Sequence, residues 1–315
     1  MSKDYFLVIR GGINSTFQDF GRENLYHIGI PFSGAMDKRN YLIANKLAGN
    51  LTTDAVIEFA FQGPCLKYFG NKRNIVVTGN VNFKVIKEDY SEIQVKNYET
   101  IEINNGDVID ILNTKNSVYG YLSSNGGFEI DEVWGSYSTT TRAFVGPNGG
   151  KKLADNQKIF LKKSEKFSHR LLIYSDTKIE FIRVIEGTNF NYFSEESIKN
   201  FFSKEYFVTN LSDRMGMRLD GQKLKNLKNT NIKSEGLVKG TIQVPADGNP
   251  IILLSDHGTI GGYPKLAVVI SADYDRLVQI PPGSKIRFEK VKLKDAENLY
   301  KLYIMETNYI LNKIL

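Results

Sequence analysis

Four blocks of this sequence are richer in Gly, Asp, Arg and Gln than ordinary strands and turns. They cover residues 11–22 with 29–37, 212–219, 234–236 with 240–250, and 255–265. Polar, glycine-rich loops let backbone N–H groups approach a ligand closely and place side chains beside it without strain. We therefore expect the chemistry of the protein to reside in these blocks.

The second block carries two arginines, Arg214 and Arg218, four residues apart. This spacing keeps two side chains on one face of a helical turn or of an extended strand. Two guanidinium groups on one face can hold a carboxylate or a phosphate through bidentate hydrogen bonds. The structural alternative is that each arginine pairs with an acid of the fold, such as Asp213 or Asp220. The sequence leaves both interpretations open.

The fourth block begins with Asp256 and His257, directly before a glycine-rich loop. A histidine in such a position can act as an acid, a base or a hydrogen-bond donor to substrate. It can equally be a loop histidine without a catalytic task. Tyr263 and Lys265 follow and are predicted ligand contacts, although residues 262–264 could also form a simple turn.

The third block adds two hydrogen-bonding side chains, Gln243 and Asp247. We expect both of them in the same cleft as the fourth block.

The composition excludes several classes of site. The single cysteine, Cys65, rules out an intramolecular disulfide, a CxxC redox site and a multi-cysteine zinc site. The three histidines are far apart in sequence, so we expect no metal site.

Net charge is +6, from 41 basic and 35 acidic residues. Because the basic residues are scattered, we do not expect nucleic-acid binding to be the main function.

No segment suggests a membrane or an export signal. The N-terminus lacks the apolar core of a signal peptide. The longest apolar runs, such as residues 266–270, are far shorter than the roughly 18 residues that a membrane-spanning helix needs. We expect a cytoplasmic protein.

Three further motifs fail on inspection. Residues 146–152 look like a phosphate-binding loop, but the first glycine is out of register and Lys152 stands where Ser or Thr is needed. No GxSxG nucleophile motif is present. Asp37 occupies the place of the lysine in the Ala-Met-Lys-Met biotinylation site, so we expect no biotin attached to this chain.

Short apolar runs about ten residues apart, separated by turn signals, predict a mostly β protein. Helices are expected at three places. The first is near 37–49, capped by Asp37 and closed by Gly49; the second is 195–202, capped by Ser194; the third begins at Asp295 and has Leu299, Leu302, Tyr303 and Ile310 near one face. A change of pattern predicts two domains, 1–195 and 196–315.

Taken in order, these blocks resemble the biotin-dependent carboxyltransferase family, also called allophanate hydrolase subunit 2. The matching motifs are Thr-x-Gln-Asp-x-Gly-Arg (16–22), Ser-Gly-Ala-Met-Asp (33–37), Ala-Asn-x-Leu-x-Gly-Asn (44–50), Asp-Arg-Met-Gly-x-Arg-Leu (213–219), Ser-Glu-Gly (234–236), Gly-x-Ile-Gln-Val-Pro-x-Asp-Gly-x-Pro-Ile (240–251) and Gly-Gly-Tyr-Pro-Lys (261–265). The resemblance spans nearly the whole chain.

The resemblance departs from the family pattern at two places. After residues 138–142 the family usually continues with Gly-Gly and then Gly-Arg-x-Leu, where this chain has Gly146-Pro147 and Gly150-Lys151. A lysine in place of arginine lacks the planar fork of donors. Around Asp256 the family usually carries Gln and Thr, where this chain has His257 and Gly258. These departures bear on the substrate more than on the fold.

The resemblance implies two cyclophilin-like β-barrel domains with a few short helices. Its best-studied branch implies the C subunit of a multi-subunit, ATP-dependent 5-oxoprolinase that converts 5-oxo-L-proline to L-glutamate. The expected partners are a B-type subunit, similar to Kip-type inhibitors, and an A-type subunit, with ATP used by the complex. Two alternatives stay open: the carboxyltransferase half of a biotin-dependent urea or amide carboxylase, and a non-catalytic antagonist of a B-type kinase inhibitor.

The residues and the resemblance together give a set of expected site residues and no expected metal ligand. The catalytic candidates are Asp256, His257, Tyr263 and Lys265. The substrate-binding candidates are Arg214, Arg218, Gln243, Asp247, Gln18, Arg22 and Asp37.

Overall fold

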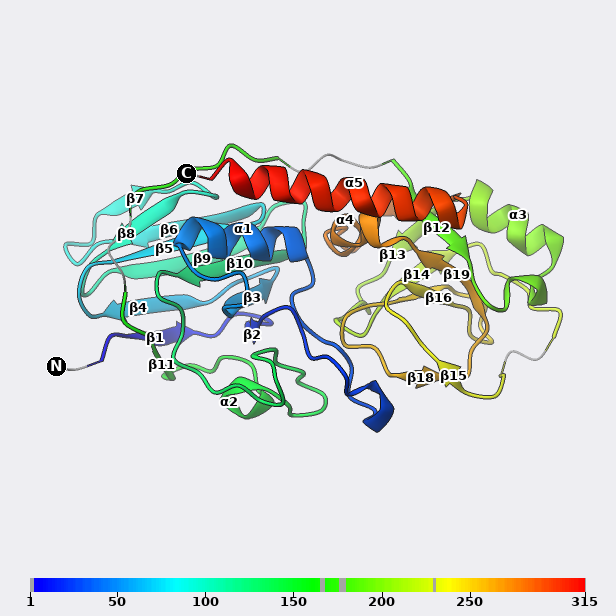
Figure 1. Cartoon of the computed structure of the whole chain (residues 1–315), viewed down its shortest axis with the longest axis horizontal. Coiled ribbons are helices and arrows are strands. Elements are labelled where there is room, and N and C mark those ends of the chain that lie inside the picture. Colours follow the sequence, from blue (N-terminus) through cyan, green and yellow to red (C-terminus); the bar gives the residue numbers. More distant parts are fainter. Residues whose placement is uncertain (1–2, 165–167, 176–179, 229–230, 315) are drawn as a thin grey trace. The chain divides into compact units, whose positions relative to one another are not determined.

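The computed structural model describes residues 3–164, 168–175, 180–228 and 231–314 (Figure 1). The chain forms two compact units. Unit 1 comprises Met1–Glu23, Ser33–Ser175 and Asn308–Leu315, and unit 2 comprises Asn24–Phe32 and Asp176–Thr307. A short segment near each end of the chain therefore belongs to the unit formed mainly by the other half.

Unit 1 contains two antiparallel sheets. The six-stranded sheet has the order β11-β1-β4-β9-β6-β7, and the five-stranded sheet has the order β2-β3-β10-β5-β8. The first consists of β1 (Tyr5–Arg10), β4 (Cys65–Phe69), β6 (Val81–Ile86), β7 (Glu92–Gln94), β9 (Val108–Thr114) and β11 (Lys158–Phe160), and the second of β2 (Thr16–Gln18), β3 (Val56–Ala60), β5 (Arg73–Thr78), β8 (Thr100–Ile103) and β10 (Tyr119–Ser124).

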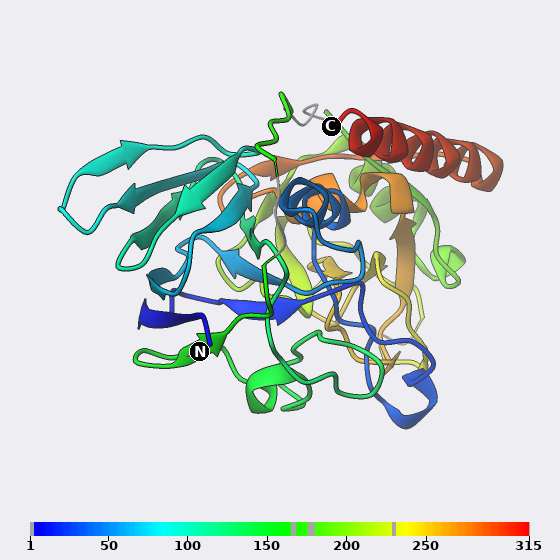
Figure 2. The ribbon, with the colours of Figure 1, turned by 60° about the vertical axis from the view of Figure 1, so that its left-hand side comes forward.

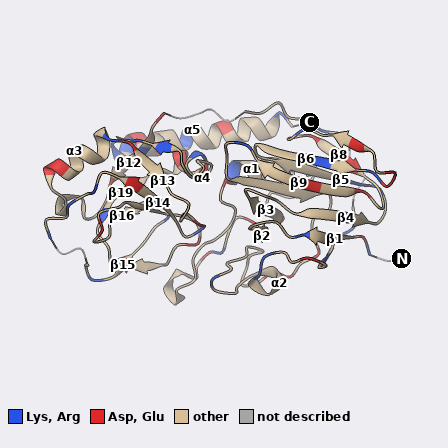
Figure 3. Ribbon diagram, turned by 180° about the vertical axis from the view of Figure 1, so that it is seen from behind, with Lys and Arg blue, Asp and Glu red and all other residues tan. Residues whose placement is uncertain are grey.

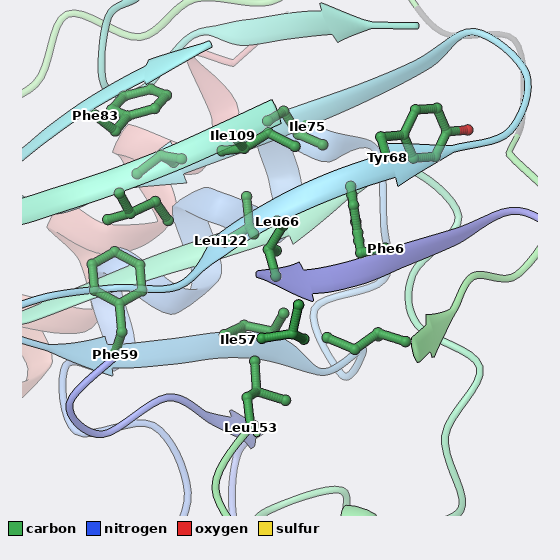
Figure 4. Packing of buried hydrophobic residues seen from close by; sticks show 14 of the residues in the cluster. Phe6, Ile57, Phe59, Leu66, Tyr68, Ile75, Phe83, Ile109, Leu122 and Leu153 are labelled. Carbon is green, nitrogen blue, oxygen red and sulfur yellow. The ribbon is translucent and has the colours of Figure 1, made fainter. Parts of the chain in front are cut away.

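The main hydrophobic core of unit 1 gathers apolar side chains from both sheets. Phe6 and Leu66 from the larger sheet belong to the same buried cluster as Ile57, Ile75 and Leu122 from the smaller one (Figure 4). Each of these side chains is fully buried. The period of two along each strand sends alternate residues into this cluster, which is why the strands were visible in the sequence.

Helix α1 (Lys38–Ala48) covers the other face of the five-stranded sheet (Figure 2). Along β5, Ile75 and Val77 point into the main core, whereas Val76 packs with Ile43 and Leu47 of α1. The side chain of Asp37 caps the helix, as the sequence predicts, and Gly49 closes it in the left-handed conformation with φ 75°. A single turn, α2 (Pro147–Gly150), follows later in the unit.

Unit 2 is built on one eight-stranded sheet with the order β20-β13-β14-β17-β16-β19-β12-β21. Its strands are β12 (Ile182–Glu186), β13 (Tyr206–Val208), β14 (Gly216–Gly221), β16 (Thr241–Gln243), β17 (Ile251–Leu253), β19 (Lys265–Val269), β20 (Lys285–Ile286) and β21 (Phe288–Lys290). The two edge strands, β20 and β21, are separated by a single residue, Arg287. The sheet is therefore nearly closed into a barrel, which confirms the mostly β, barrel-type fold predicted from the sequence.

Helices pack against this sheet. Helix α3 (Glu195–Ser203) is capped by Ser194 as predicted, and its Phe201 ring stacks on Phe288 of β21 with ring centroids 4.5 Å apart. Short helical turns complete the unit: η1 (Tyr26–Ile28), η2 (Phe190–Tyr192), η3 (Ser271–Asp273) and α4 (Tyr274–Val278). A two-residue ladder joins β15 (Glu235–Gly236) to β18 (Ile260–Gly261).

The C-terminal helix α5 (Leu293–Asn312) begins two residues before the predicted start at Asp295. Ala296 is buried, and Leu299 and Tyr303 pack beside it against residues of η3 and β12. The prediction that Leu302 shares this face is wrong, because its side chain is 59% exposed. The inward stripe follows a spacing of three to four residues, and Leu302 precedes Tyr303 by one position, about 100° around the helix.

The unit boundary lies earlier than residue 195, the position suggested by the change of sequence pattern. Strand β12 pairs with β19 and β21, so residues 182–186 form part of the unit 2 sheet. The crossing segments 24–32 and 308–315 have no signature in composition or periodicity. Basic and acidic residues are interspersed along the elements of both units (Figure 3).

The stacking of Phe201 on Phe288 generates a stability prediction. We expect Phe201→Ala to lower the free energy of unfolding by about 3–5 kcal/mol, because it removes a fully buried ring that covers the closing strand of the barrel. The matched control is Phe207→Ala, since Phe207 is 44% exposed and should cost less than about 1 kcal/mol. Urea unfolding measures both. Equal losses in the two variants would contradict this assignment of the core.

Candidate functional site

Arg214 and Asp256 form a buried ion pair in unit 2. Arg214 Nε donates to Asp256 Oδ2 at 2.8 Å and Nη2 donates to Oδ1 at 2.9 Å, with both side chains less than 10% exposed. Backbone pairing holds them in register, because Asp256 N donates to the carbonyl oxygen of Arg214. The acid that pairs with Arg214 is therefore Asp256, neither of the two acids considered from the sequence. The charge of this arginine is compensated inside the fold.

His257 lies beside this pair and is hydrogen-bonded through both ring nitrogens. Nδ1 is 2.6 Å from the carbonyl oxygen of Gly258, and Nε2 is 2.8 Å from the hydroxyl oxygen of Tyr26. A carbonyl only accepts, so Nδ1 carries the proton and Nε2 accepts from Tyr26. Burial lowers the pKa of His257 below its ordinary value of 6.5, and burial raises the pKa of Tyr26 to about 12. At neutral pH both groups are uncharged.

Lys265 and Gln243 are cross-strand partners on β19 and β16. Lys265 Nζ lies 2.6 Å from Glu235 Oε2; the lysine side chain is 6% exposed and the glutamate 46%. Gln243 Nε2 donates to the carbonyl oxygen of Tyr263 at 3.3 Å. The β15–β18 ladder brings Glu235 next to residues 260–261, so the third and fourth sequence blocks meet here. We call Glu235, Gln243, Tyr263 and Lys265 the lysine cluster.

The strand register separates the lysine cluster from the Arg214–Asp256 pair. Gly216, directly after the Arg214 turn, pairs with Leu253 at the end of β17. Gln243 pairs with Ile251 at the start of the same strand. The two groups therefore belong to opposite ends of β17.

The remaining candidates of unit 2 are exposed. Arg218 lies on β14 with its side chain outside, so the spacing of four residues does not give it a common face with Arg214. The cause is a turn at Asp213, whose Oδ1 accepts from the backbone N–H groups of Met215 and Gly216, the first residue of β14. Asp247 forms a similar turn, with Oδ1 accepting from Asn249 N at 3.1 Å.

In unit 1, Gln18 and Arg22 are buried and hold the segment 133–139. Gln18 Nε2 donates to the carbonyl oxygen of Thr139 at 2.9 Å. Arg22 donates from Nε to the carbonyl oxygen of Val133 at 3.1 Å and from Nη2 to that of Ser138 at 2.5 Å. Both side chains are at most 1% exposed, so these contacts stabilise the fold of the unit.

Asp37 is also a buried structural group. Its Oδ1 accepts from Asn40 N at 2.9 Å and its Oδ2 from Asn40 Nδ2 at 2.6 Å. Its own backbone N–H donates to the Tyr121 hydroxyl at 2.7 Å, and the preceding Met36 N–H donates to Glu58 Oε2 at 2.7 Å. Burial raises the pKa of Tyr121 well above its usual range. The start of α1 is thus fixed by several polar contacts.

Asp19, Tyr26, Glu58 and Glu235 were not selected from the sequence and also take part in the polar contacts of the two units. Asp19 does so by accepting from Ser136 Oγ at 2.7 Å. Asp19 and Glu235 lie inside the polar blocks, so their neighbours already marked them. Glu58 stands alone in the apolar run Val-Ile-Glu-Phe-Ala, and an acid inside a buried strand is a usable signal. Tyr26 falls between the two parts of the first block and has no such signal.

Four further observations bear on the chemistry. Within the described part of the chain, no group of three or more His, Cys, Asp or Glu is placed to hold a metal ion. No described helix is long and apolar enough to cross a membrane. Cys65 is buried, and burial raises the pKa of its thiol to about 11, which makes it a poor nucleophile. After Gly150 the chain is extended at Lys151, so residues 146–152 lack the helix of a phosphate-binding loop.

Comparison with known families decides the identity of the fold. The model of the carboxyltransferase domain, subdomain A and B, matches residues 28–290. The chain belongs to the carboxyltransferase domain family. It is 33% identical over 285 residues to the 5-oxoprolinase C subunit of Haemophilus influenzae, a match that covers 90% of this chain and 91% of that protein. It is 31% identical to the 5-oxoprolinase C subunit of Escherichia coli, with 92% of each chain covered.

The same family includes parts of larger enzymes. This carboxyltransferase-family chain superimposes over its whole length on the urea amidolyase of K. lactis with a TM-score of 0.89 and 26% identity. It superimposes equally completely on the urea carboxylase of Kluyveromyces lactis with a TM-score of 0.87 and 26% identity. The chain spans 21% and 31% of those two proteins.

The Arg214–Asp256 pair generates a second prediction. We expect Arg214→Ala to lower the free energy of unfolding by about 3–5 kcal/mol, because the buried Asp256 carboxylate then faces no guanidinium. Adding Asp256→Ala should cost less than the sum of the two single changes, since each single variant already loses the pair. The control is the exposed Arg218→Ala, with a change within about 0.5 kcal/mol. Additive losses in the double variant, measured by urea unfolding, would refute the pairing.

The role of Asp37 generates a third prediction. We expect Asp37→Ala to destabilise the protein by about 1–2 kcal/mol, because it removes the cap of α1. Asp37→Asn should recover only part of this loss, since an asparagine oxygen also accepts from Asn40 N, whereas its amide nitrogen would face Asn40 Nδ2, another donor. Thermal unfolding of both variants checks this. If Asp37→Asn is as unstable as Asp37→Ala, the carboxylate charge matters more than the cap.

Proposed function

We propose that this chain is the C subunit of a multi-subunit, ATP-dependent 5-oxoprolinase that converts 5-oxo-L-proline to L-glutamate. The observation that supports it is the extent of the match: identities of 33% and 31% run over about nine tenths of both partners in each comparison with a 5-oxoprolinase C subunit. Saccharomyces cerevisiae urea amidolyase, 28% identical, matches over only 17% of its length.

The proposed reaction opens a lactam, which is a stable amide. Transfer of the γ-phosphoryl group of ATP to the lactam oxygen activates the ring carbonyl carbon. Water adds to that carbon, and the C–N bond breaks as the nitrogen takes a proton. A second water then displaces phosphate from the acyl phosphate that results. The sum consumes 5-oxo-L-proline, ATP and two waters, and yields L-glutamate, ADP and phosphate. ATP enters as a substrate of the complex, and we assign its binding to no residue of this chain.

Within this proposal, Lys265 is the cation that binds the substrate carboxylate. Its ammonium group is buried, whereas its partner Glu235 is half-exposed. An ion pair with one exposed partner contributes little stability, so an incoming carboxylate can take the place of Glu235. Arg214 is less suited to this task, because its guanidinium is already held by the equally buried Asp256. Lys265 is thus the better candidate for recognising a small anionic substrate.

The other candidates take supporting roles in this proposal. Gln243 and the partly exposed Tyr263 lie beside Lys265 and supply hydrogen-bonding groups to the lactam. Asp256 positions Arg214. His257 can move a proton only when Nε2 is released from the Tyr26 hydroxyl, because both of its ring nitrogens are engaged in this structure.

Partners complete the proposed enzyme. We propose a B-type subunit, similar to Kip-type inhibitors, and an A-type subunit, since the two bacterial relatives are named as subunits. The proposed setting is the cytoplasm, and we propose that no biotin is attached to this chain.

Carboxyl transfer from biotin is the second candidate function. The observation that favours it is the superposition on urea carboxylase over the whole chain, with a TM-score of 0.87. This alternative requires a partner that carries biotin, because the chain corresponds to less than a third of that enzyme.

The deciding experiment is recovery of the tagged chain with its partners from its own cells, followed by an assay for glutamate released from 5-oxo-L-proline. We expect release only when ATP is present. In the same complex, Lys265→Gln should raise the KM for 5-oxo-L-proline at least tenfold, because one charge-assisted contact to the carboxylate is lost. Lys285→Gln on the exposed edge strand β20 is the control and should leave KM unchanged.

Other results of recovering the tagged chain with its partners would support a different function or a different site. Partners without glutamate release, one of them biotinylated, would support carboxyl transfer. A tightly bound partner without biotin and without turnover would support the antagonist role. An active complex in which Lys265→Gln keeps the normal KM would retain the function and remove Lys265 from the site.

A further inference from the structure

Residues 20–34 form a loop whose two ends lie together in unit 1. Ala35 N donates to the carbonyl oxygen of Asp19 at 2.8 Å. Gly34, in the left-handed conformation with φ 83°, lies so close to Phe20 that a Cβ would come within 2.6 Å of the Phe20 carbonyl oxygen. The base of the loop is therefore closed and allows little freedom, whereas its middle, residues 24–32, belongs to unit 2.

Two large apolar side chains in the middle of the loop are exposed, although Pro31 is buried. Ile28 is 58% exposed and Phe32 is 45% exposed. The loop is organised internally by η1, with Gly29 N donating to the carbonyl oxygen of Tyr26, and by the Tyr26–Phe32 ring contact at 5.0 Å. Segments with few buried apolar contacts open with low free energy. Single polar contacts can therefore decide how often this loop is closed.

The Tyr26 contact with His257 is such an interaction. The hydroxyl and Nε2 are 2.8 Å apart, and the two rings meet edge-on with centroids 5.9 Å apart. His257 is 2% exposed, and its other ring nitrogen is fixed by Gly258. As long as the loop is closed, Tyr26 occupies the one ring nitrogen of His257 that could accept a proton.

We propose that residues 24–32 are a pH-sensitive latch, in which Tyr26 closes over neutral His257 and protonation of His257 releases the loop. The proposal does not depend on the function of the complex. It makes Tyr26 the group that controls access to the His257 Nε2 atom.

The charges around His257 give the direction of the effect. Lys239 disfavours a positive charge on the ring, and Asp256 favours one but is already held by Arg214. Tyr26 stays neutral, since burial raises its pKa to about 12. A protonated His257 could still donate to the Tyr26 oxygen, but its charge would remain buried. Water solvates that charge once the loop opens.

Proton linkage gives the direction in which closure of the loop changes with pH. Burial lowers the pKa of His257 in the closed loop below the ordinary value of 6.5. The closed form thus binds fewer protons than the open form in the pH range between the two pKa values. Closure is fully favoured above about pH 6.5 and is lost as the pH falls through the lowered value.

Hydrogen exchange of the full chain tests the latch. The exchange of peptides within 24–32 is measured at pH 7.5 and pH 5.5 and corrected for intrinsic exchange with the same peptides free in solution. We expect the protection factor to fall several-fold at pH 5.5. His257→Gln keeps an acceptor but has no titratable ring, so it should remove this pH dependence and leave the loop protected at both values.

A second variant tests the contact itself. Tyr26→Phe keeps the ring and removes the hydroxyl, so the protection factor at pH 7.5 should fall about fivefold, as expected for one lost hydrogen bond. Tyr309→Phe, 61% exposed on α5, is the control and should leave residues 24–32 unchanged. Equal corrected protection of the wild-type loop at both pH values would overturn the latch. Unchanged protection in Tyr26→Phe would overturn the role of Tyr26.

Discussion

The Asp19 carboxylate is the group that fixes residues 136–138 and the base of the loop at 20–34 in unit 1. It accepts from Ser136 Oγ at 2.7 Å, Tyr137 N at 2.6 Å and Gly21 N at 2.9 Å, and also from the hydroxyl of Ser138. These bonds fix the segment that Gln18 and Arg22 contact. Because the backbone carbonyl of the same residue accepts from Ala35 N, Asp19 also closes the base of the loop at 20–34. A buried carboxylate is tolerated here because its oxygens are saturated with donors.

The need of a buried charge for a partner also distinguishes the two charged pairs of unit 2. Arg214 and Asp256 are both buried, so each compensates the other and the pair acts as part of the scaffold. Lys265 is buried while Glu235 is half-exposed, which makes this pair the one that can exchange partners. A pair in which both side chains are buried is structural. A buried cation whose partner is exposed is a candidate binding group. The functional proposal depends on this asymmetry.

The sequence predicts most of the local structure and little of the long-range pairing. The caps at Asp37 and Ser194 are local signals, and both helices begin where they predict. The polar blocks include residues 235–236 and 260–261, which the β15–β18 ladder brings together. The burial of Arg214 against the exposure of Arg218 depends on a turn at Asp213 and on pairing with β17. The spacing of the two arginines contains neither fact.

The Tyr26–His257 contact is a second long-range pairing that the sequence does not predict. The two residues are 231 positions apart, and Tyr26 lies in the gap between two recognisable motifs. Only the fold shows that His257 is neutral, buried and capped by a hydroxyl. Sequence reasoning identified the histidine as a candidate acid or base, whereas the structure shows what has to move before it can act.

The proposed function places the small anionic lactam at the lysine cluster. The most direct measurement is hydrogen exchange of the assembled complex with and without 5-oxo-L-proline. We expect increased protection in the peptides that cover residues 232–237 and 258–265 of this chain. Protection elsewhere in the complex, with none in these two segments, would contradict it.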